Sequence, residues 1–153
     1  IKGDLLRALP ALSLNFHLGL SPWYKGSATL FWPFYFMEPQ CSGITIHKIV
    51  AAADAGEVLH QSVPILKKGM GIHDVGVATV LQGANDLVNA LKKILSGTEL
   101  SFTPQTINGR LFLTRDFEPQ HLRVNYDLFN DRMVDEYLAG QLGNKTPKLI
   151  ANL

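Results

Sequence analysis

The sequence predicts an α/β fold from three observations: two β-prone segments near the N-terminus and one long amphipathic helix after them. Residues 1–98 carry these patterns, whereas residues 99–153 carry shorter and mostly helical ones. Hydrophobic residues make up 46% of the 153 residues, which is enough to build a core in a domain of this size. We therefore expect a sheet flanked by helices over residues 1–98, followed by a strand and two short helices over residues 99–153.

The first β-prone segment presents two polar side chains together. Leu14 and Phe16 are the apolar members of an alternating run, a pattern typical of a half-buried strand. Asn15 and His17 are the polar members, so they share the opposite face. Because Gly19 follows and breaks regular structure, the pair is expected where the strand opens into a loop, a common place for catalytic groups.

The second β-prone segment carries a carboxylate between two strands. Residues 44–47 form a short β-prone run, and residues 57–65 form another. Asp54 lies between them, after small residues and before Gly56, so we expect it in a loop. His47 continues the first of these strands, and we assign it a structural or orienting role outside the catalytic set.

The amphipathic helix is expected to begin at Asp74 as its N-cap and to end before Gly97. Lys92 and Lys93 lie in its last turn, where positive charge is favourable. Its apolar residues follow the helical spacing: Val77, Val80, Leu81, Ala84, Leu87, Val88, Leu91 and Leu95. We expect this apolar face to cover the sheet.

The remaining elements are shorter. Residues 28–37 form the longest apolar stretch, which is too short to span a bilayer and indicates a buried helix broken near Pro33. A turn before residue 110 predicts a strand over residues 110–114. Two helices should follow, one over residues 119–129 with proline in its first turn and one over residues 131–138.

Composition narrows the class of function. With 14 basic and 13 acidic residues the net charge is +1, so the sequence carries no broad field for nucleic acid. The only cysteine, Cys41, cannot form an internal disulfide and favours a reducing compartment such as the cytoplasm. The five histidines lack metal-ligand spacing, and we predict no metal site and no membrane partner.

Two motifs carry a resemblance to a known family. The run N-F-H-L-G-L-S-P-W-Y-K-G at residues 15–26, followed by G-I-T-I-H-K at 43–48 and D-A-G-E-V-L at 54–59, resembles the catalytic domain of the folate-dependent formyltransferases. That family includes enzymes acting on glycinamide ribonucleotide, methionyl-tRNA and sugar amines, and formyltetrahydrofolate hydrolases. The resemblance implies that residues 1–98 are the C-terminal half of this domain, a partial Rossmann-like formyltransferase sheet flanked by helices.

The resemblance also implies a reaction in one-carbon metabolism. A formyl group would pass from the co-substrate 10-formyltetrahydrofolate to a primary amine through a tetrahedral intermediate. Asn15 and His17 would donate N–H groups to its negative oxygen, the type of contribution that is largest in such reactions. Asp54 would hold His17, favour its protonated form and relay the amine's proton. The pterin ring would lie against a loop of small residues, Val50, Ala51, Ala52 and Ala53.

Acceptor recognition is less well defined by the motifs. Leu18 and Ser21 stand where the family commonly has Pro and Leu, and Lys25 stands where Arg is usual, which removes a planar fork for phosphate or carboxylate. The trio does not distinguish a transferase from a hydrolase, in which water replaces the amine. A third alternative is a non-catalytic binding module with the same fold.

The family's usual N-terminal βαβ half, which contributes to the folate and acceptor sites, is not in this sequence. We therefore expect the chain to be a fragment and to be inactive by itself. Residues 99–153 are too short and too helical for the β-barrel of methionyl-tRNA formyltransferases, which favours a small-molecule amine, such as a nucleotide-linked sugar, over tRNA. This tail either packs on the sheet or forms an acceptor-site wall or a homodimer surface.

Overall fold

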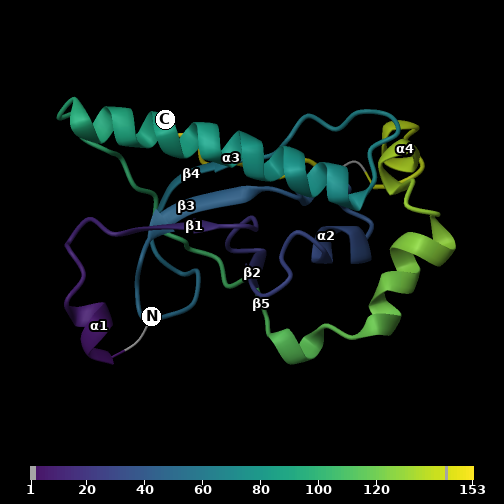
Figure 1. Ribbon diagram of the computed structural model, residues 1–153, viewed down its shortest axis with the longest axis horizontal. Coiled ribbons are helices and arrows are strands. Elements are labelled where there is room, and N and C mark those ends of the chain that lie inside the picture. The colour runs from purple at the N-terminus through teal and green to yellow at the C-terminus, as the bar shows by residue number, and fades with distance from the viewer. Residues whose placement is uncertain (1–2, 144) are drawn as a thin grey trace.

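A three-stranded antiparallel sheet forms the centre of the structure, a computed structural model that describes residues 3–143 and 145–153 (Figure 1). The strands are β1 (Leu14–His17), β3 (Ile44–Lys48) and β4 (Val58–Ser62), with β3 in the middle. Asn15 of β1 pairs directly with His47 of β3. Both predicted β-prone segments are therefore strands of one sheet, and β1 has no second strand partner among the described residues.

A smaller sheet lies beside the first. Its two strands, β2 (Tyr24–Gly26) and β5 (Arg110–Phe112), run parallel. The predicted strand at residue 110 is thus confirmed, although it is shorter than expected. It joins a strand far away in the sequence, whereas a tight turn would have paired it with its neighbour.

The apolar stretch at residues 28–37 forms less helix than its composition suggests. Only Trp32–Tyr35 are helical (α2), and a 3₁₀ turn, η1 (Pro39–Cys41), follows. Pro33 lies in the first turn of α2 and does not break it, because the first turn needs no N–H from that residue. The expectation of a helix broken at this proline is therefore wrong.

The long helix α3 (Ile72–Leu95) runs along the sheet (Figure 1). It begins two residues before the expected start, because Gly71 is the N-cap and Asp74 is the third helical residue. The Asp74 carboxylate accepts a hydrogen bond from the Gly71 N–H at 2.9 Å. Asp74 therefore caps the helix by reaching back to the backbone, as in a capping box. The helix ends as expected, with Gly97 in the left-handed conformation.

The buried face of α3 differs from the predicted one. Its fully buried positions are Val75, Thr79, Gly83, Asp86 and Ala90. The predicted apolar face is mostly open, with Val77 61%, Leu81 62% and Leu95 87% exposed. The reason is close packing: a Cβ on Gly83 would lie 2.6 Å from the Phe16 ring and 2.8 Å from Ile44. The small residues thus bring the helix onto the sheet, and the expectation that the apolar stripe covers the sheet is wrong.

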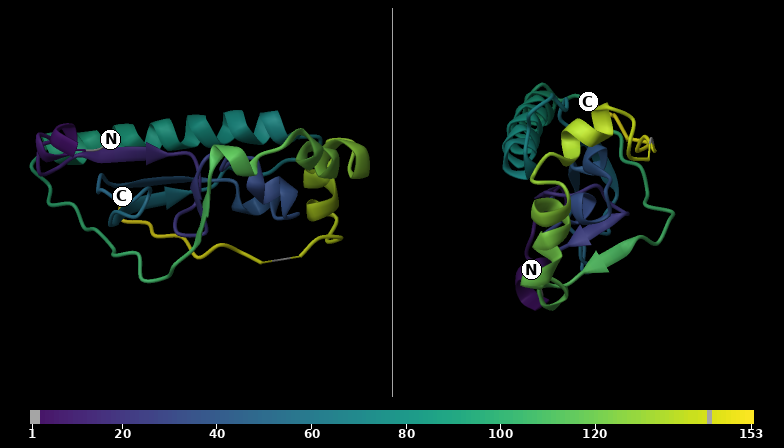
Figure 2. Two further views of the ribbon diagram at one scale, coloured as in Figure 1. Left: turned by 90° about the horizontal axis from the view of Figure 1, so that it is seen from below. Right: turned by 90° about the vertical axis from the view of Figure 1, so that its right-hand side faces the viewer.

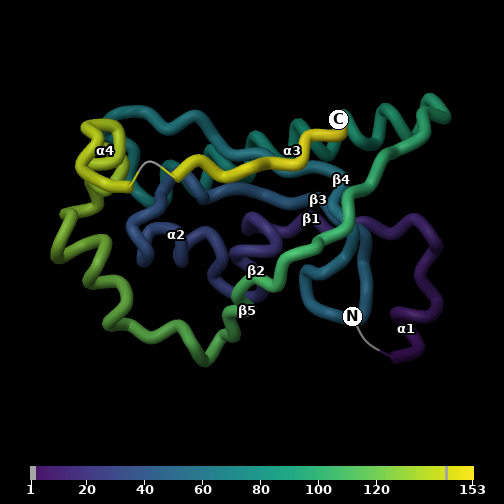
Figure 3. Tube along the Cα trace, turned by 180° about the vertical axis from the view of Figure 1, so that it is seen from behind, coloured from purple at the N-terminus to yellow at the C-terminus, as the bar shows by residue number. Residues whose placement is uncertain are grey.

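The C-terminal tail returns to the sheet twice. Thr103 forms a bridge to Val58 of β4, and Ala151 forms one to His60, so two separate parts of the tail lie against β4 (Figures 2 and 3). Between them the chain turns away through a series of short helical elements. These are η2 (Thr114–Asp116), η3 (Pro119–His121), the π-helix η4 (Val124–Leu128) and α4 (Met133–Leu138).

Two predictions concern these tail helices. The second is confirmed by α4, which is followed by Gly140 at a positive φ. The first is only partly right, because a 3₁₀ turn and a π-helix replace the continuous helix expected over residues 119–129. Among the helices that the structure describes, none combines the length and the apolar character needed to cross a bilayer.

Candidate active site

The structure brings Asn15, His17 and Asp54 together at the end of β1. The Asn15 Nδ2 atom lies 3.3 Å from Asp54 Oδ1, and the His17 Nδ1 atom lies 3.5 Å from Asp54 Oδ2. Asn15 and His17 share one face of β1, and Asp54 reaches them from the loop between β3 and β4. The spatial grouping matches the sequence prediction, whereas the chemical roles of the three side chains stay predictions.

The backbone around Asp54 is tightly constrained. Asp54 itself has a φ of +48°, in the left-handed region that costs most residues energy. Gly56 lies so close to β3 that a Cβ would be 1.8 Å from the Lys48 carbonyl oxygen, so only glycine fits. Gln105, from the tail, donates hydrogen bonds to the carbonyls of Asp54 and Gly56 at 2.9 and 2.7 Å. No motif in the sequence singled out Gln105.

The carboxylate of Asp54 is also held by the neighbouring loop. The Gly26 N–H donates to Asp54 Oδ2 at 2.8 Å, which fixes this oxygen beside His17. The other oxygen faces Asn15 and His47, with the His47 Nε2 atom 3.5 Å away. Asp54 thus joins three segments of the chain that are distant in sequence.

His47 orients Asn15. A carbonyl oxygen can only accept a hydrogen bond, so the 2.8 Å contact to the Lys48 oxygen assigns a proton to His47 Nδ1. In the neutral ring the Nε2 atom then accepts a hydrogen bond from Asn15 Nδ2 at 3.1 Å. These contacts agree with the orienting role predicted for His47.

In this structure His17 does not present a free N–H to a substrate. By the same reasoning its Nε2–H donates to the Tyr24 carbonyl at 2.8 Å, and its Nδ1 atom faces Asp54. The two amide hydrogens of Asn15 are likewise directed at His47 and Asp54. The predicted donors therefore bind each other and the backbone, and a substrate oxygen must displace one of these contacts.

The pKa values of the central pair separate the two groups. Burial lowers the pKa of His17 more than the hydrogen bond to Tyr24 and the charge of Asp54 raise it, and His47 lowers it further. The expectation that Asp54 makes His17 cationic is thus outweighed by burial. Burial acts to raise the pKa of Asp54, but His47, the Gly26 N–H and His17 together hold it below its ordinary value. At neutral pH an ionised Asp54 lies beside a neutral His17 that can accept a proton.

We expect the protein to lose stability as the pH falls below about 6.5, the ordinary pKa of histidine. His17 and His60 both have lowered pKa values because they are buried, so the unfolded state binds more protons in this range. The free energy of unfolding should therefore rise with pH between the folded pKa values and 6.5. Denaturant unfolding at a series of pH values measures it, and the slope should decrease in His17→Gln and in His60→Gln. A stability that increases on acidification contradicts this expectation.

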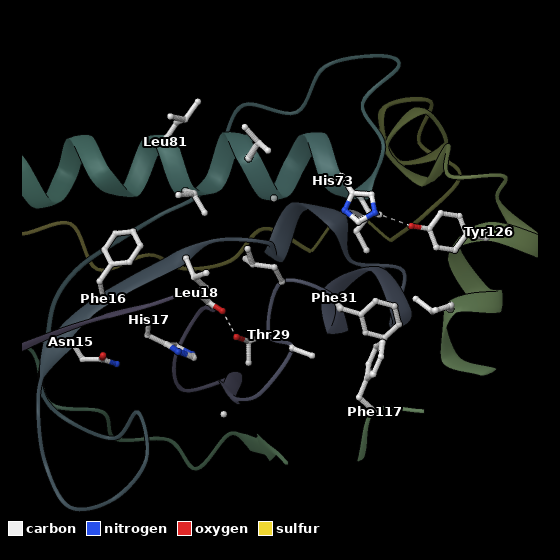
Figure 4. Close-up of a pocket in the computed structure, with 18 residues that line it drawn as sticks. Asn15, Phe16, His17, Leu18, Thr29, Phe31, His73, Leu81, Phe117 and Tyr126 are labelled. Carbon is white, nitrogen blue, oxygen red and sulfur yellow. Dashed lines mark hydrogen bonds between the residues drawn. The ribbon is translucent and has the colours of Figure 1, made fainter. Parts of the chain in front are cut away.

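A cavity of about 940 Å³ opens beside the trio. Asn15 and His17 line one end of it, and the first half of α3, the loop at residues 28–31 and the tail line the rest (Figure 4). The predicted pterin loop does not line it. Val50, Ala51, Ala52 and Ala53 lie in an exposed loop that leads into Asp54. Their contact with folate stays a prediction.

Two buried polar residues behind the site were missed by sequence reasoning. Thr45 donates a hydrogen bond to the Gly19 carbonyl at 2.7 Å and accepts one from the Ser21 N–H at 3.0 Å. Gln61 donates to the Ser21 carbonyl at 2.5 Å and accepts from the Ile150 N–H at 3.2 Å. This network fixes the loop after β1 and attaches the tail to β4. Thr45 lies in the quoted motif, but nothing in the sequence marked either residue as buried and fully engaged.

An α/β sheet with an amide, an imidazole and a carboxylate at the end of one strand defines the formyltransferase class of fold, and solved structures confirm that fold. The chain is similar to the formyltransferase PseJ from Anoxybacillus kamchatkensis, with a TM-score of 0.71 and 21% identity over 87% of this chain and 68% of that one. It is also similar to a 4-N formyltransferase from Francisella tularensis, with a TM-score of 0.64 and 17% identity over 80% of this chain and 53% of that one. No protein-family model matches the sequence.

A third similar structure is an N-formyltransferase from Helicobacter canadensis, with a TM-score of 0.60 and 25% identity over 69% of this chain and 39% of that one. It was solved with folinic acid and dTDP-3-aminofucose, and PseJ with UDP-4,6-dideoxy-4-formamido-L-AltNAc and tetrahydrofolate. This chain thus has the Rossmann-like fold of the formyltransferases, and it spans between 39% and 68% of the length of these three proteins.

Proposed function

We propose that this chain carries the reaction centre of an N-formyltransferase. The enzyme would move a formyl group from 10-formyltetrahydrofolate to a primary amine on a nucleotide-linked sugar. The observation that carries this proposal is the group Asn15, His17 and Asp54, joined by contacts of 3.3 and 3.5 Å at the mouth of a large cavity. The solved formyltransferases with the same fold, two of them bound to folates and nucleotide-linked sugars, support it.

The side chains can perform each step of this reaction. The amine attacks the formyl carbon, and the carbonyl oxygen becomes negative and accepts N–H groups from Asn15 and His17. For this, the His17 ring exchanges its Tyr24 contact for the substrate oxygen. The proton lost by the amine moves to His17 and Asp54 and then to N10 of the folate, whose bond to the formyl carbon breaks. Tetrahydrofolate and the formamide are the products.

Hydrolysis of the same donor uses the same trio, but the cavity favours a transferase. A volume of about 940 Å³ is at the upper end of the range for sites that bind whole small molecules, and a water nucleophile needs no such space. The reducing environment that suits the single buried thiol of Cys41 agrees with a reaction in the cytoplasm.

The complete active site, we further propose, includes an additional α/β segment. The similar structures are longer than the part that this chain matches. In the described residues β1 lacks a second strand partner, and the Val77, Leu81 and Leu95 side chains of α3 are more than half exposed. An added strand along β1 and cover over α3 would satisfy both surfaces.

The function is tested by incubating the natural full-length protein with 10-formyltetrahydrofolate and a panel of amines. The panel contains UDP-linked and dTDP-linked amino sugars, glycinamide ribonucleotide and methionyl-tRNA. We expect tetrahydrofolate release that depends on an amino sugar, together with formylated sugar detected by mass spectrometry. Release at the same rate without any amine identifies a hydrolase, and failure to bind the donor identifies a non-catalytic module.

A further inference from the structure

The cavity beside the trio has a second end that the proposed reaction does not use. Asn15 and His17 line the reactive end, whereas the distal end is built from the loop before α2, the start of α3 and the tail (Figure 4). The residues that line the distal end are Phe31, His73, Phe117, Leu122 and Tyr126. Three of them belong to the tail, so a segment distant in sequence from the trio bounds the same cavity.

The distal end is aromatic and partly open. The Phe31 and Phe117 rings pack edge to face with their centroids 4.9 Å apart. The Tyr126 hydroxyl lies 3.2 Å from His73 Nε2, and this pair spans the gap between η4 and α3 (Figure 4). Phe117 and Tyr126 are 36% and 38% exposed, so ring surface remains available on the cavity side.

The chemistry of this end selects one part of a nucleotide-linked sugar. Among the described residues that line the cavity, none is lysine or arginine, so the charged diphosphate finds no partner there. Exposed aromatic rings instead favour a flat, uncharged ring, which gains by stacking. The Tyr126 hydroxyl and the His73 imidazole can each donate or accept a hydrogen bond, as the polar edge of a pyrimidine requires.

Position leads to the same part of the molecule. The amine must reach His17 for reaction, so the remainder of the acceptor extends away from the trio along the cavity. Anchoring that remote part fixes the amine and supplies much of the rate enhancement through orientation. A base held at the distal end would leave the sugar between Phe31 and His17, over Ala28 and Thr29.

We propose that the distal end binds the nucleobase of the acceptor, with Phe117 as the stacking residue and Tyr126 and His73 as its hydrogen-bonding partners. The inference rests on the proposed function for the identity of the acceptor. It gives the tail a role in acceptor specificity and assigns no part of the chemical step to it.

The test uses the natural full-length protein and four variants. Phe117→Ala removes the stacking surface, Tyr126→Phe keeps the ring and removes the hydroxyl, and Leu128→Ala is the control, because Leu128 lies in the same helix and outside the cavity. Phe117→Leu provides a second variant in case the alanine protein fails to fold. Calorimetry measures the Kd of UDP, dTDP and folinic acid, and steady-state kinetics measures KM and kcat for the amino sugar.

We expect Phe117→Ala to weaken UDP and dTDP binding and to raise the acceptor KM by about 10-fold or more, with kcat and folinic acid binding close to wild type. Tyr126→Phe should have a smaller effect in the same direction, and Leu128→Ala none. If folinic acid binding weakens instead, the distal end binds the pterin and the proposal is overturned. Unchanged binding of all three ligands also overturns it. If UDP binding depends on Phe117 but no sugar is formylated, the proposed function fails and the nucleobase site stands.

Discussion

Asp54→Asn is expected to lower the kcat of formyl transfer by about 10²- to 10⁴-fold, the usual range for the loss of a general acid or base. The amide keeps the size of the carboxyl group and an oxygen that can accept from Gly26. It carries no charge and cannot take the proton of the attacking amine. Its NH₂ group would also face the Asn15 amide or the His17 ring, which disturbs the contacts that now hold the trio together.

The matched control is Glu57→Gln, which removes a carboxylate three residues later in the same segment. Glu57 pairs with Lys48 at 2.7 Å on the surface and does not contact the trio, so this variant should keep a rate close to wild type. Initial rates of tetrahydrofolate release at saturating amino sugar measure both variants. Equal rates for Asp54→Asn and the wild type would show that Asp54 has no part in the proton transfer.

Gly56→Ala is expected to reduce the free energy of unfolding by about 3 kcal/mol, the upper part of the range for overpacked sites. The added methyl group would lie 1.8 Å from the Lys48 carbonyl oxygen and 3.2 Å from His47 Nδ1. The backbone must move to make room, and Asp54 moves with it. Activity should therefore fall even at temperatures at which the variant remains folded.

Gly76→Ala provides the opposite case. Gly76 lies within α3 and a methyl group there would meet nothing within 4 Å, so alanine should raise the free energy of unfolding by about 0.5–1 kcal/mol. Urea unfolding followed by circular dichroism compares the two variants. If Gly56→Ala proves as stable as the wild type, the close approach of the loop to β3 does not hold Asp54 in place.

The sequence was most informative where the signal was local. Alternation along β1 placed Asn15 and His17 on one face, and this needed no knowledge of distant contacts. The position of Asp54 between two β-prone runs was also local, and the resemblance linked it to the pair. The C-terminal end of α3 followed from Gly97, whose left-handed conformation is found in the structure.

The sequence was misleading where packing decides. Periodicity predicts that a helix has an apolar face, but it does not specify which face meets the sheet. Gly83 decides this for α3 by allowing contact with Phe16, which leaves Leu81 in the open. The protonation state of His17 also depends on tertiary structure, because burial outweighs the nearby charge of Asp54.

The tail illustrates a second limit. Gln105 holds the backbone of the Asp54 loop, and Tyr126 lies against His73 at the distal end of the cavity. These contacts cross about 50 residues of chain, and no local pattern encodes them. Their existence favours the acceptor-site wall among the alternatives that the sequence left open for the tail.

The central proposal, that Asn15, His17 and Asp54 act on a formyl group between two bound substrates, is tested most directly by a crystal structure of the ternary complex. The natural full-length protein would be crystallised with folinic acid and a UDP-linked or dTDP-linked amino sugar. We expect the sugar amine and N10 of the folate on either side of His17, with the amine within about 3 Å of His17 or Asp54. Ligands bound elsewhere, with His17 still closed on the Tyr24 carbonyl, would contradict the proposal.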